Sequence, residues 1–193
     1  MKIIQIGANN GKDHVFDLIK ENKDSLELAI LIEPIPFIID ELKSQYKDIN
    51  NAVVENIAIT DDENIKTMTL YYLGDSNYEV SSFSKNHVMI HKPPGSSYSL
   101  ESLEVPCFTI NNLIDKYNLT DIDYLFIDTE GLDVYIIGSI DFTKCNIKNI
   151  IFEVMHTDGV FSRGENFDKI SNYLTQLGYH LSSIDQYNVK ASL

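Results

Sequence analysis

The chain has 193 residues, 44% of them hydrophobic, and its 29 acidic against 15 basic residues give a formal net charge of -14. These values fit one globular domain over residues 1–193. The negative charge argues against nucleic acid and against anionic membrane surfaces as partners, because both are themselves negatively charged.

Apolar runs and cysteines narrow the class of protein further. Glu33 interrupts the longest apolar run, 28–39, so no run reaches the length of a membrane span. Residue 3 already belongs to a predicted core strand, so we expect no signal peptide. Cys107 and Cys145 are too few for a disulfide framework and are interpreted as buried thiols. We therefore expect a cytoplasmic protein.

The first predicted element is a buried strand over residues 3–6, followed by a turn bounded by Gly7 and Gly11 and a helix over 13–22. Strand, glycine turn and helix form a common cradle for nucleotide-like ligands, because glycine lets the ligand approach the backbone. Asn9 stands where the dinucleotide fingerprint has its middle glycine. This favours a ligand without a pyrophosphate, such as S-adenosylmethionine. A tight turn without any ligand is the alternative.

The next two strands complete the pattern of a parallel sheet. The apolar run 28–32 predicts a strand buried on both faces, and it ends at Glu33, a carboxylate placed to accept hydrogen bonds from ribose hydroxyls. A helix begins at Pro36, and residues 52–59 form the third strand and its exit. Short connections of this kind require right-handed crossovers between parallel strands.

The pattern changes over residues 64–106. Strands are predicted at 67–73 and 79–83 with a turn at 74–77, so we expect an inserted hairpin. Residues 84–102 show little periodicity and are predicted to be a loop, either a lid or simply mobile. A lid over 81–103 is our hypothesis. Residues 104–108 are predicted to be a short edge strand.

The C-terminal half returns to alternating strands and helices. Two predicted strands, 122–127 and 147–154, end in polar side chains at the edge where open α/β sheets bind ligands. The first runs into Asp128 and Glu130, and the second into Glu153 and His156. Three helices are predicted in this half. The first begins at Thr109, the second begins at Asp133, and the third ends at Gly178. An antiparallel pair of strands, 179–184 and 188–190, closes the fold.

Taken in order, these motifs resemble the FkbM family of S-adenosylmethionine-dependent methyltransferases. The motifs are 5–11, 33–34, 56–59, 81–82, 127–131 and 152–154. The resemblance implies a Rossmann-like class I methyltransferase fold, with a mostly parallel seven-stranded sheet, helices on both faces and a C-terminal antiparallel hairpin. It also implies O-methylation of a hydroxyl on a sugar, glycan or small natural product. The chain departs from the family at Gln5, more often acidic, and at Thr129, more often valine. It also starts directly on the first strand, without the helix that commonly covers the cofactor.

We expect the cofactor to bind along the exits of the first, second, third and fourth strands. Glu33 would hold the ribose, and Asp128 would anchor the ammonium group or act as a base. The full predicted set is Gln5, Gly7, Ala8, Asn9, Gly11, Glu33, Asn56, Ile57, Ala58 and Asp128. Within it, residues 7–9 would line the methionine half and residues 56–58 would border the adenine.

For the acceptor we expect Glu153 or His156 to act as general base and Glu130 to orient the hydroxyl. The same three side chains could hold a divalent metal, but no fixed ligand spacing requires one, so no metal is assigned. Two other classes stay open. One is a nicotinamide-dependent oxidoreductase, and the other is a domain that binds the cofactor without catalysis.

Overall fold

The computed structural model describes residues 1–74, 77–158, 161 and 163–193. Its main sheet is mostly parallel, and β13 runs opposite to the other strands. In spatial order the strands are β12 (His180–Ser183), β13 (Asn188–Ser192), β11 (Asn149–Glu153), β9 (Tyr124–Ile127), β1 (Lys2–Ile6), β2 (Leu28–Ile32) and β3 (Ala52–Glu55). The predicted α/β fold with a closing antiparallel pair is confirmed.

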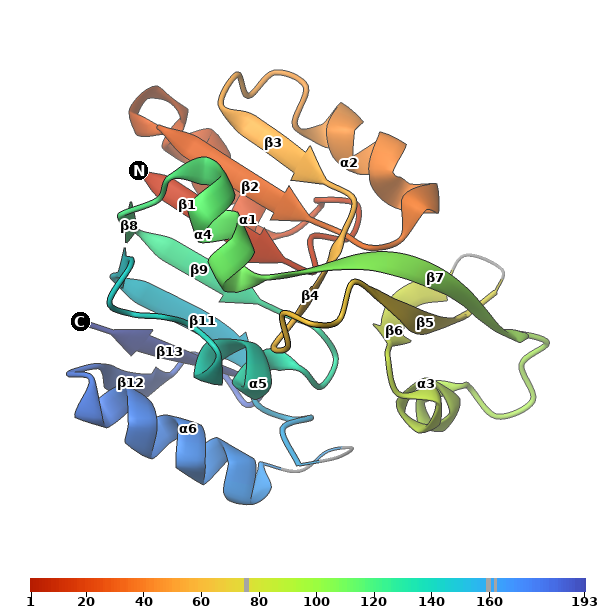
Figure 1. The fold of residues 1–193 in the computed structure, drawn as a ribbon. Coiled ribbons are helices and arrows are strands. Elements are labelled where there is room, and N and C mark those ends of the chain that lie inside the picture. Colours follow the sequence, from red (N-terminus) through yellow and green to blue (C-terminus); the bar gives the residue numbers. More distant parts are fainter. Residues whose placement is uncertain (75–76, 159–160, 162) are drawn as a thin grey trace.

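Helices cover both faces of this sheet, as predicted. Side chains alternate along a strand, so Ile3 of β1 packs on one helical layer and Ile4 on the other. The first layer is α1 (His14–Glu21) and α2 (Ile39–Gln45), and the second, in front of the sheet in Figure 1, is α4 (Ile110–Tyr117), α5 (Asp133–Gly138) and α6 (Gly164–Gln176). Short 3-10 helices, η1 (Lys23–Ser25) and η2 (Pro36–Ile38), precede β2 and α2. Among the described residues, no helix combines the length and the apolar character that crossing a membrane requires.

Local signals explain where several elements begin and end. Asp13 caps α1 by accepting hydrogen bonds from the N–H groups of Val15 and Phe16. Thr109 begins α4 with a capping box that it shares with Asn112. Two short strands, β8 (Asp121–Ile122) and β10 (Asn146–Ile147), pair with each other just before β9 and β11.

A second sheet stands beside the main one and carries most of the predicted insertion (Figure 1). Its order is β4 (Ala58–Thr60), β7 (Leu100–Thr109), β5 (Thr67–Leu73) and β6 (Asn77–Ser82), and α3 (Lys85–His91) follows β6. The β5–β6 hairpin agrees with the prediction. The predicted turn at 74–77 includes residues 75–76, which lie outside the described residues.

Two expectations for this region are wrong. The predicted loop 84–102 contains α3, which Ser84 caps by accepting from the His87 N–H. The predicted edge strand 104–108 is part of the ten-residue β7, an interior strand between β4 and β5. Residues 52–59, predicted as the third strand and its exit, do form β3 in the main sheet, but the exit continues as β4, which pairs with β7 in the second sheet. The two errors arise because long-range pairing, rather than local pattern, decides these elements.

Candidate active site

The turn after β1 is held in place by close packing of the chain on itself. Gly7 has φ +83°, and a Cβ there would lie 1.9 Å from the Asp128 carbonyl oxygen. Gly11 has φ +72°, and a Cβ there would lie 2.7 Å from Tyr46 and 2.8 Å from Leu42. Both glycines are therefore required by the fold. A valine at either position would therefore disturb the fold as well as occupy ligand space.

A cavity of about 310 Å³ opens beside this turn, between the exit of β2, β4 and the inserted sheet. Such a volume is at the lower end of the range for small-molecule sites. Six of the predicted cofactor residues line it: Gly7, Asn9, Glu33, Ile57, Ala58 and Asp128. The inserted sheet closes it with Leu70, Tyr78, Ser81 and Phe83. Sequence analysis missed the apolar part of this wall because those side chains belong to no motif.

Glu33 sits inside the cavity wall and is 6% exposed. Its two oxygens accept hydrogen bonds of 2.8 Å from the backbone N–H groups of Asn9 and Ile35. Burial raises the pKa of Glu33 to about 7, although these two hydrogen bonds oppose the shift. Each carboxylate oxygen has a further lone pair, so Glu33 can still accept hydrogen bonds from ligand hydroxyls.

Three other predicted residues lie beside the cavity rather than in its wall. Gln5 and Ala8 line a separate hollow of about 280 Å³ on the other side of the Gly7 turn. There Gln5 Nε2 donates to Asp13 Oδ2 at 2.7 Å. Asn56 is exposed, and its amide donates to two carbonyls of the turn after β2, at 2.8 and 3.0 Å. Asn56 therefore shapes the turn that carries Glu33.

Four carboxylates crowd at the carboxyl ends of β9 and β11. Burial, reinforced by the neighbouring carboxylates, raises the pKa of Asp128 to about 7 and that of Glu153 to about 8. Burial likewise raises the pKa of Asp133 to about 6, and Glu130 adds its charge to the group. Although protein atoms lie close around Asp128, it is exposed through this cavity and through the hollow on the other side of the Gly7 turn, and it lines both. In the described part of the chain, neither lysine nor arginine pairs with these four. The edge therefore favours a positively charged ligand.

A third space, a hollow of about 440 Å³, adjoins the cavity beside Glu33 through Phe83 and Glu130. Glu130 lies in a left-handed turn with φ +54°, and Ser82 of β6 donates to its carbonyl at 3.0 Å. The structure brings the predicted acceptor residues together, but only Glu130 and His156 line this hollow, and Glu153 is not among its lining residues. His156 Nε2 lies 3.8 Å from Glu130 Oε2 and 3.6 Å from Glu153 Oε1. Among the described residues Glu153 Oε2 is buried without a hydrogen-bond partner.

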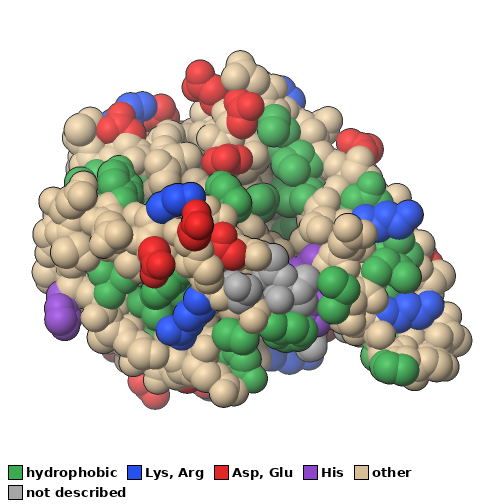
Figure 2. All heavy atoms as spheres, turned by 90° about the horizontal axis from the view of Figure 1, so that it is seen from below, with side chains coloured by type: hydrophobic (Ala, Val, Ile, Leu, Met, Phe, Trp, Pro, Cys, Tyr) green, Lys and Arg blue, Asp and Glu red, His purple; other side chains and the backbone are tan. Residues whose placement is uncertain are grey.

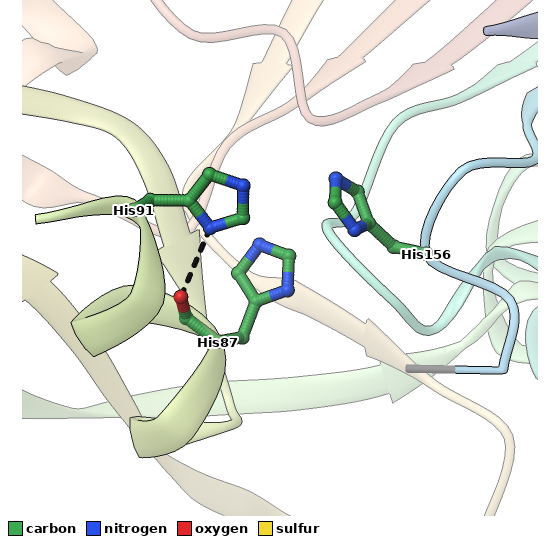
Figure 3. Close-up of side chains that lie close together, drawn as sticks. All are labelled: His87, His91 and His156. Carbon is green, nitrogen blue, oxygen red and sulfur yellow. Dashed lines mark hydrogen bonds between the residues drawn. The ribbon is translucent and has the colours of Figure 1, made fainter. Parts of the chain in front are cut away.

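Two histidines that sequence analysis left in a predicted loop join this group. His87 Nε2 lies 2.7 Å from Glu130 Oε2, and His91 follows one helical turn later. Figure 3 shows both rings projecting from α3 toward His156. Figure 2 shows histidine side chains at the boundary between the inserted part and the rest of the molecule. The i, i+4 spacing of two histidines was the available signal, but it carries weight only on a helix.

We compared the sequence and the fold with those of known proteins. Residues 5–181 match the family model described as Methyltransferase FkbM domain. The crystal structure of methyltransferase FkbM from Methylobacillus flagellatus KT aligns at TM-score 0.57 and 15% identity, over 100% of this chain and 43% of that one. Fibrillarin from Methanococcus jannaschii, described as a pre-rRNA processing protein, aligns at TM-score 0.51 and 13% identity, over 99% of this chain and 65% of that one.

These identities support a shared fold, and the chain spans less than half of the FkbM structure that it matches. No curated protein sequence matches this chain. The shared fold is that of class I S-adenosylmethionine-dependent methyltransferases, as expected from the order of motifs.

Proposed function

Since the chain belongs to the FkbM family of methyltransferases, we propose that it transfers a methyl group from S-adenosylmethionine to a hydroxyl oxygen. The proposed acceptor is a sugar, a glycan or a small natural product. One observation carries the proposal. A cavity at the carboxyl ends of β1 and β2 contains the buried Glu33 and faces carboxylates that no described lysine or arginine neutralises.

The residues around this cavity fit the proposed cofactor. Glu33 has free lone pairs for the two ribose hydroxyls, while Ile57 and Ala58 give an apolar border for the adenine. Asp128 lies at the junction of the two hollows that flank the Gly7 turn, where it would hold the ammonium group. The cationic sulfonium and ammonium groups also match the negative edge. When bound, S-adenosylmethionine supplies a methyl group on positively charged sulfur, which keeps the electron pair of the broken carbon–sulfur bond.

The acceptor is proposed to occupy the hollow of about 440 Å³. Methyl transfer requires the acceptor oxygen to be held in line with the methyl carbon, water to be excluded and the hydroxyl proton to be removed. Glu130 lies where this hollow meets the cofactor cavity, which suits a side chain that orients the acceptor. Glu153, with an oxygen that lacks a partner among described residues, is proposed to take the proton, and His156 lies 3.6 Å from it.

Calorimetry with S-adenosylmethionine, compared with NAD, tests the first part of this proposal. We expect binding of S-adenosylmethionine and no measurable binding of NAD. Preferential binding of NAD would instead support an oxidoreductase. The turn lacks the middle glycine of the dinucleotide fingerprint, with Asn9 in its place, which disfavours that outcome.

Turnover tests the second part. The protein should convert S-adenosylmethionine to S-adenosylhomocysteine when a panel of sugars, glycans and small hydroxylated compounds is supplied. Cofactor binding without turnover on any member of a broad panel would favour the non-catalytic alternative. Mass spectrometry of the product should find the added methyl group on oxygen, and a methyl group on nitrogen or carbon would overturn the O-methylation proposal.

A further inference from the structure

We propose that His87, His91 and His156, together with Glu130, form a binding site for one divalent transition-metal ion. The three histidines offer one nitrogen each, and these nitrogens all lie within 4.8 Å of one another. Their rings converge in Figure 3, with centroids 4.4 Å apart for His87 and His91, 4.6 Å for His87 and His156, and 5.2 Å for His91 and His156. Three imidazoles from two separate segments thus face one point.

Glu130 lies beside two of these histidines and can offer a carboxylate oxygen as a further ligand. Its Oε2 lies 2.7 Å from His87 Nε2 and 3.8 Å from His156 Nε2. Ligand atoms around a tetrahedral ion with bonds of about 2.0–2.2 Å stand roughly 3.4 Å apart. The atoms joined by the hydrogen bond between His87 and Glu130 would therefore move apart by about 0.7 Å to admit the ion. The histidine nitrogens, which lie within 4.8 Å of one another, would approach by as much as about 1.4 Å.

The hydrogen bond made by His91 prepares it as a ligand. Its Nδ1 lies 2.9 Å from the backbone carbonyl of His87, and a carbonyl oxygen can only accept, so Nδ1 carries the proton. Nε2 of neutral His91 then has its lone pair directed away from that bond. In Figure 3 this second nitrogen points across the gap toward His156. Fixing a tautomer through the other ring nitrogen is the usual way in which proteins orient a metal-binding histidine.

The chemistry of these ligands selects the kind of ion. Imidazole nitrogens with one carboxylate suit Zn²⁺ and similar first-row ions, whereas Mg²⁺ and Ca²⁺ prefer oxygen ligands throughout. A dication would also offset the mutual repulsion of the carboxylates at this edge, which include Glu153, 3.6 Å from His156. Three nitrogens and one carboxylate oxygen leave room for a further ligand from the neighbouring hollow.

The site joins the inserted part to the sheet. His87 and His91 belong to α3, whereas His156 and Glu130 follow strands β11 and β9 of the main sheet. A bound ion would therefore hold α3 against the strand ends. That the ion would lie on the acceptor side of the cofactor rests on the proposed function. The binding of the ion itself does not depend on that function.

Zinc binding to the metal-free protein, measured by calorimetry without any cofactor, tests this inference. After chelator treatment, wild type should bind one Zn²⁺ per chain, and Co²⁺ should give the visible absorption bands of a low-symmetry site. His91→Ala changes a half-buried residue, so the fold should persist, and we expect its affinity to fall at least tenfold. His180→Ala, on exposed β12, is the matched control and should bind as wild type does.

Unchanged zinc affinity in His91→Ala, or equal losses in His91→Ala and His180→Ala, would overturn the inference. His91→Gln provides a second variant if the alanine form is unstable by circular dichroism. Calorimetry with S-adenosylmethionine on the same samples separates the two proposals. Zinc binding without cofactor binding would reject the proposed function alone, and cofactor binding without zinc binding would reject the metal site alone.

Discussion

The two sides of the candidate site are built in different ways. The side proposed for the cofactor consists mainly of backbone: Gly7 packs on the Asp128 carbonyl, and backbone N–H groups hold Glu33. The side proposed for the acceptor consists of side chains from separate segments, including Glu130, His87 and His156. The main-chain fold therefore determines the shape of the first side. The shape of the second side depends on side chains, each of which can be substituted without changing the others.

This difference predicts how each side fails. A substitution on the cofactor side should damage folding and binding together, because the same atoms serve both. A substitution on the acceptor side should alter chemistry or specificity and leave the fold intact. The following predictions test that contrast, from the largest expected effect to the smallest.

Gly7→Ala should cause the largest loss. Its new Cβ would lie 1.9 Å from the Asp128 carbonyl oxygen, at a φ of +83° that side chains rarely adopt. We expect the free energy of unfolding to fall by about 3–5 kcal/mol, measured by urea denaturation. Gly138→Ala is the control, because nothing lies within 4 Å of its added Cβ. A Gly7→Ala protein as stable as Gly138→Ala would show that the turn is not fixed by packing.

Glu153→Gln should lower turnover by about 10²–10⁴, as expected for loss of a general base, with little change in cofactor affinity. Steady-state rates and calorimetry on the same preparation separate these effects. Glu165→Gln, on the exposed face of α6, is the control and should keep full turnover. If both variants turn over normally, proton removal does not depend on Glu153.

Glu33→Gln should change the dependence of stability on pH. The folded protein raises the pKa of Glu33 from 4.5 to about 7, so it binds this proton more tightly than the unfolded chain does. The stabilisation is complete below about pH 4.5 and is lost as pH rises through about 7, a difference of about 3 kcal/mol at 1.36 kcal/mol per unit.

The test is urea denaturation at pH 5 and pH 8. Wild type should lose more stability than Glu33→Gln between these two values. Asp128, Asp133 and Glu153 also have raised pKa values and contribute to both proteins, so the difference between the two isolates Glu33. Equal losses in wild type and variant would place the ionisation of Glu33 outside this range.

Glu33→Ala should weaken S-adenosylmethionine binding about tenfold or more, because a charged hydrogen-bond acceptor contributes about 1.5–3 kcal/mol. Calorimetry on Glu41→Ala, an exposed carboxylate of α2, gives the baseline. An affinity equal to that baseline would remove Glu33 from the cofactor site.

The smallest effect concerns the predicted lid over 81–103. Its amide protons should exchange more slowly when cofactor and acceptor are both present, as measured by hydrogen exchange and mass spectrometry. Strand β1 is the internal reference, since its buried amides should not respond. Equal protection of these amides from exchange in every state would show that the segment is a fixed wall of the site and not a lid.

The sequence predicted the main sheet well because its signals are local. The apolar run 28–32 and the capping residues Asp13 and Thr109 act within a few neighbours, so their patterns can be recognised directly. The carboxylates at strand ends were placed correctly for a related reason. Parallel strands bring their carboxyl ends to one edge, so Glu33 and Asp128 had to meet there.

The inserted part could not be predicted in the same way. Strand β7 is interior only because β4 and β5 flank it, and although β5 was predicted as a strand, no local pattern shows that either of them pairs with β7. His87 looks like a polar residue in a weakly periodic stretch until α3 brings it 2.7 Å from Glu130. The roles of such residues depend on contacts across 43 positions of sequence, which single-sequence patterns do not encode.

The pairing of β4 with β7 has an evolutionary consequence. Thr60 and Thr109 are register partners, so the chain leaves for the inserted sheet and returns at adjacent positions. A segment whose two ends are neighbours can be lengthened, shortened or exchanged without redirecting the chain on either side. Divergence between these two positions would reshape one wall of the cavity and of the neighbouring hollow, while the Gly7 turn and Glu33 stay in place.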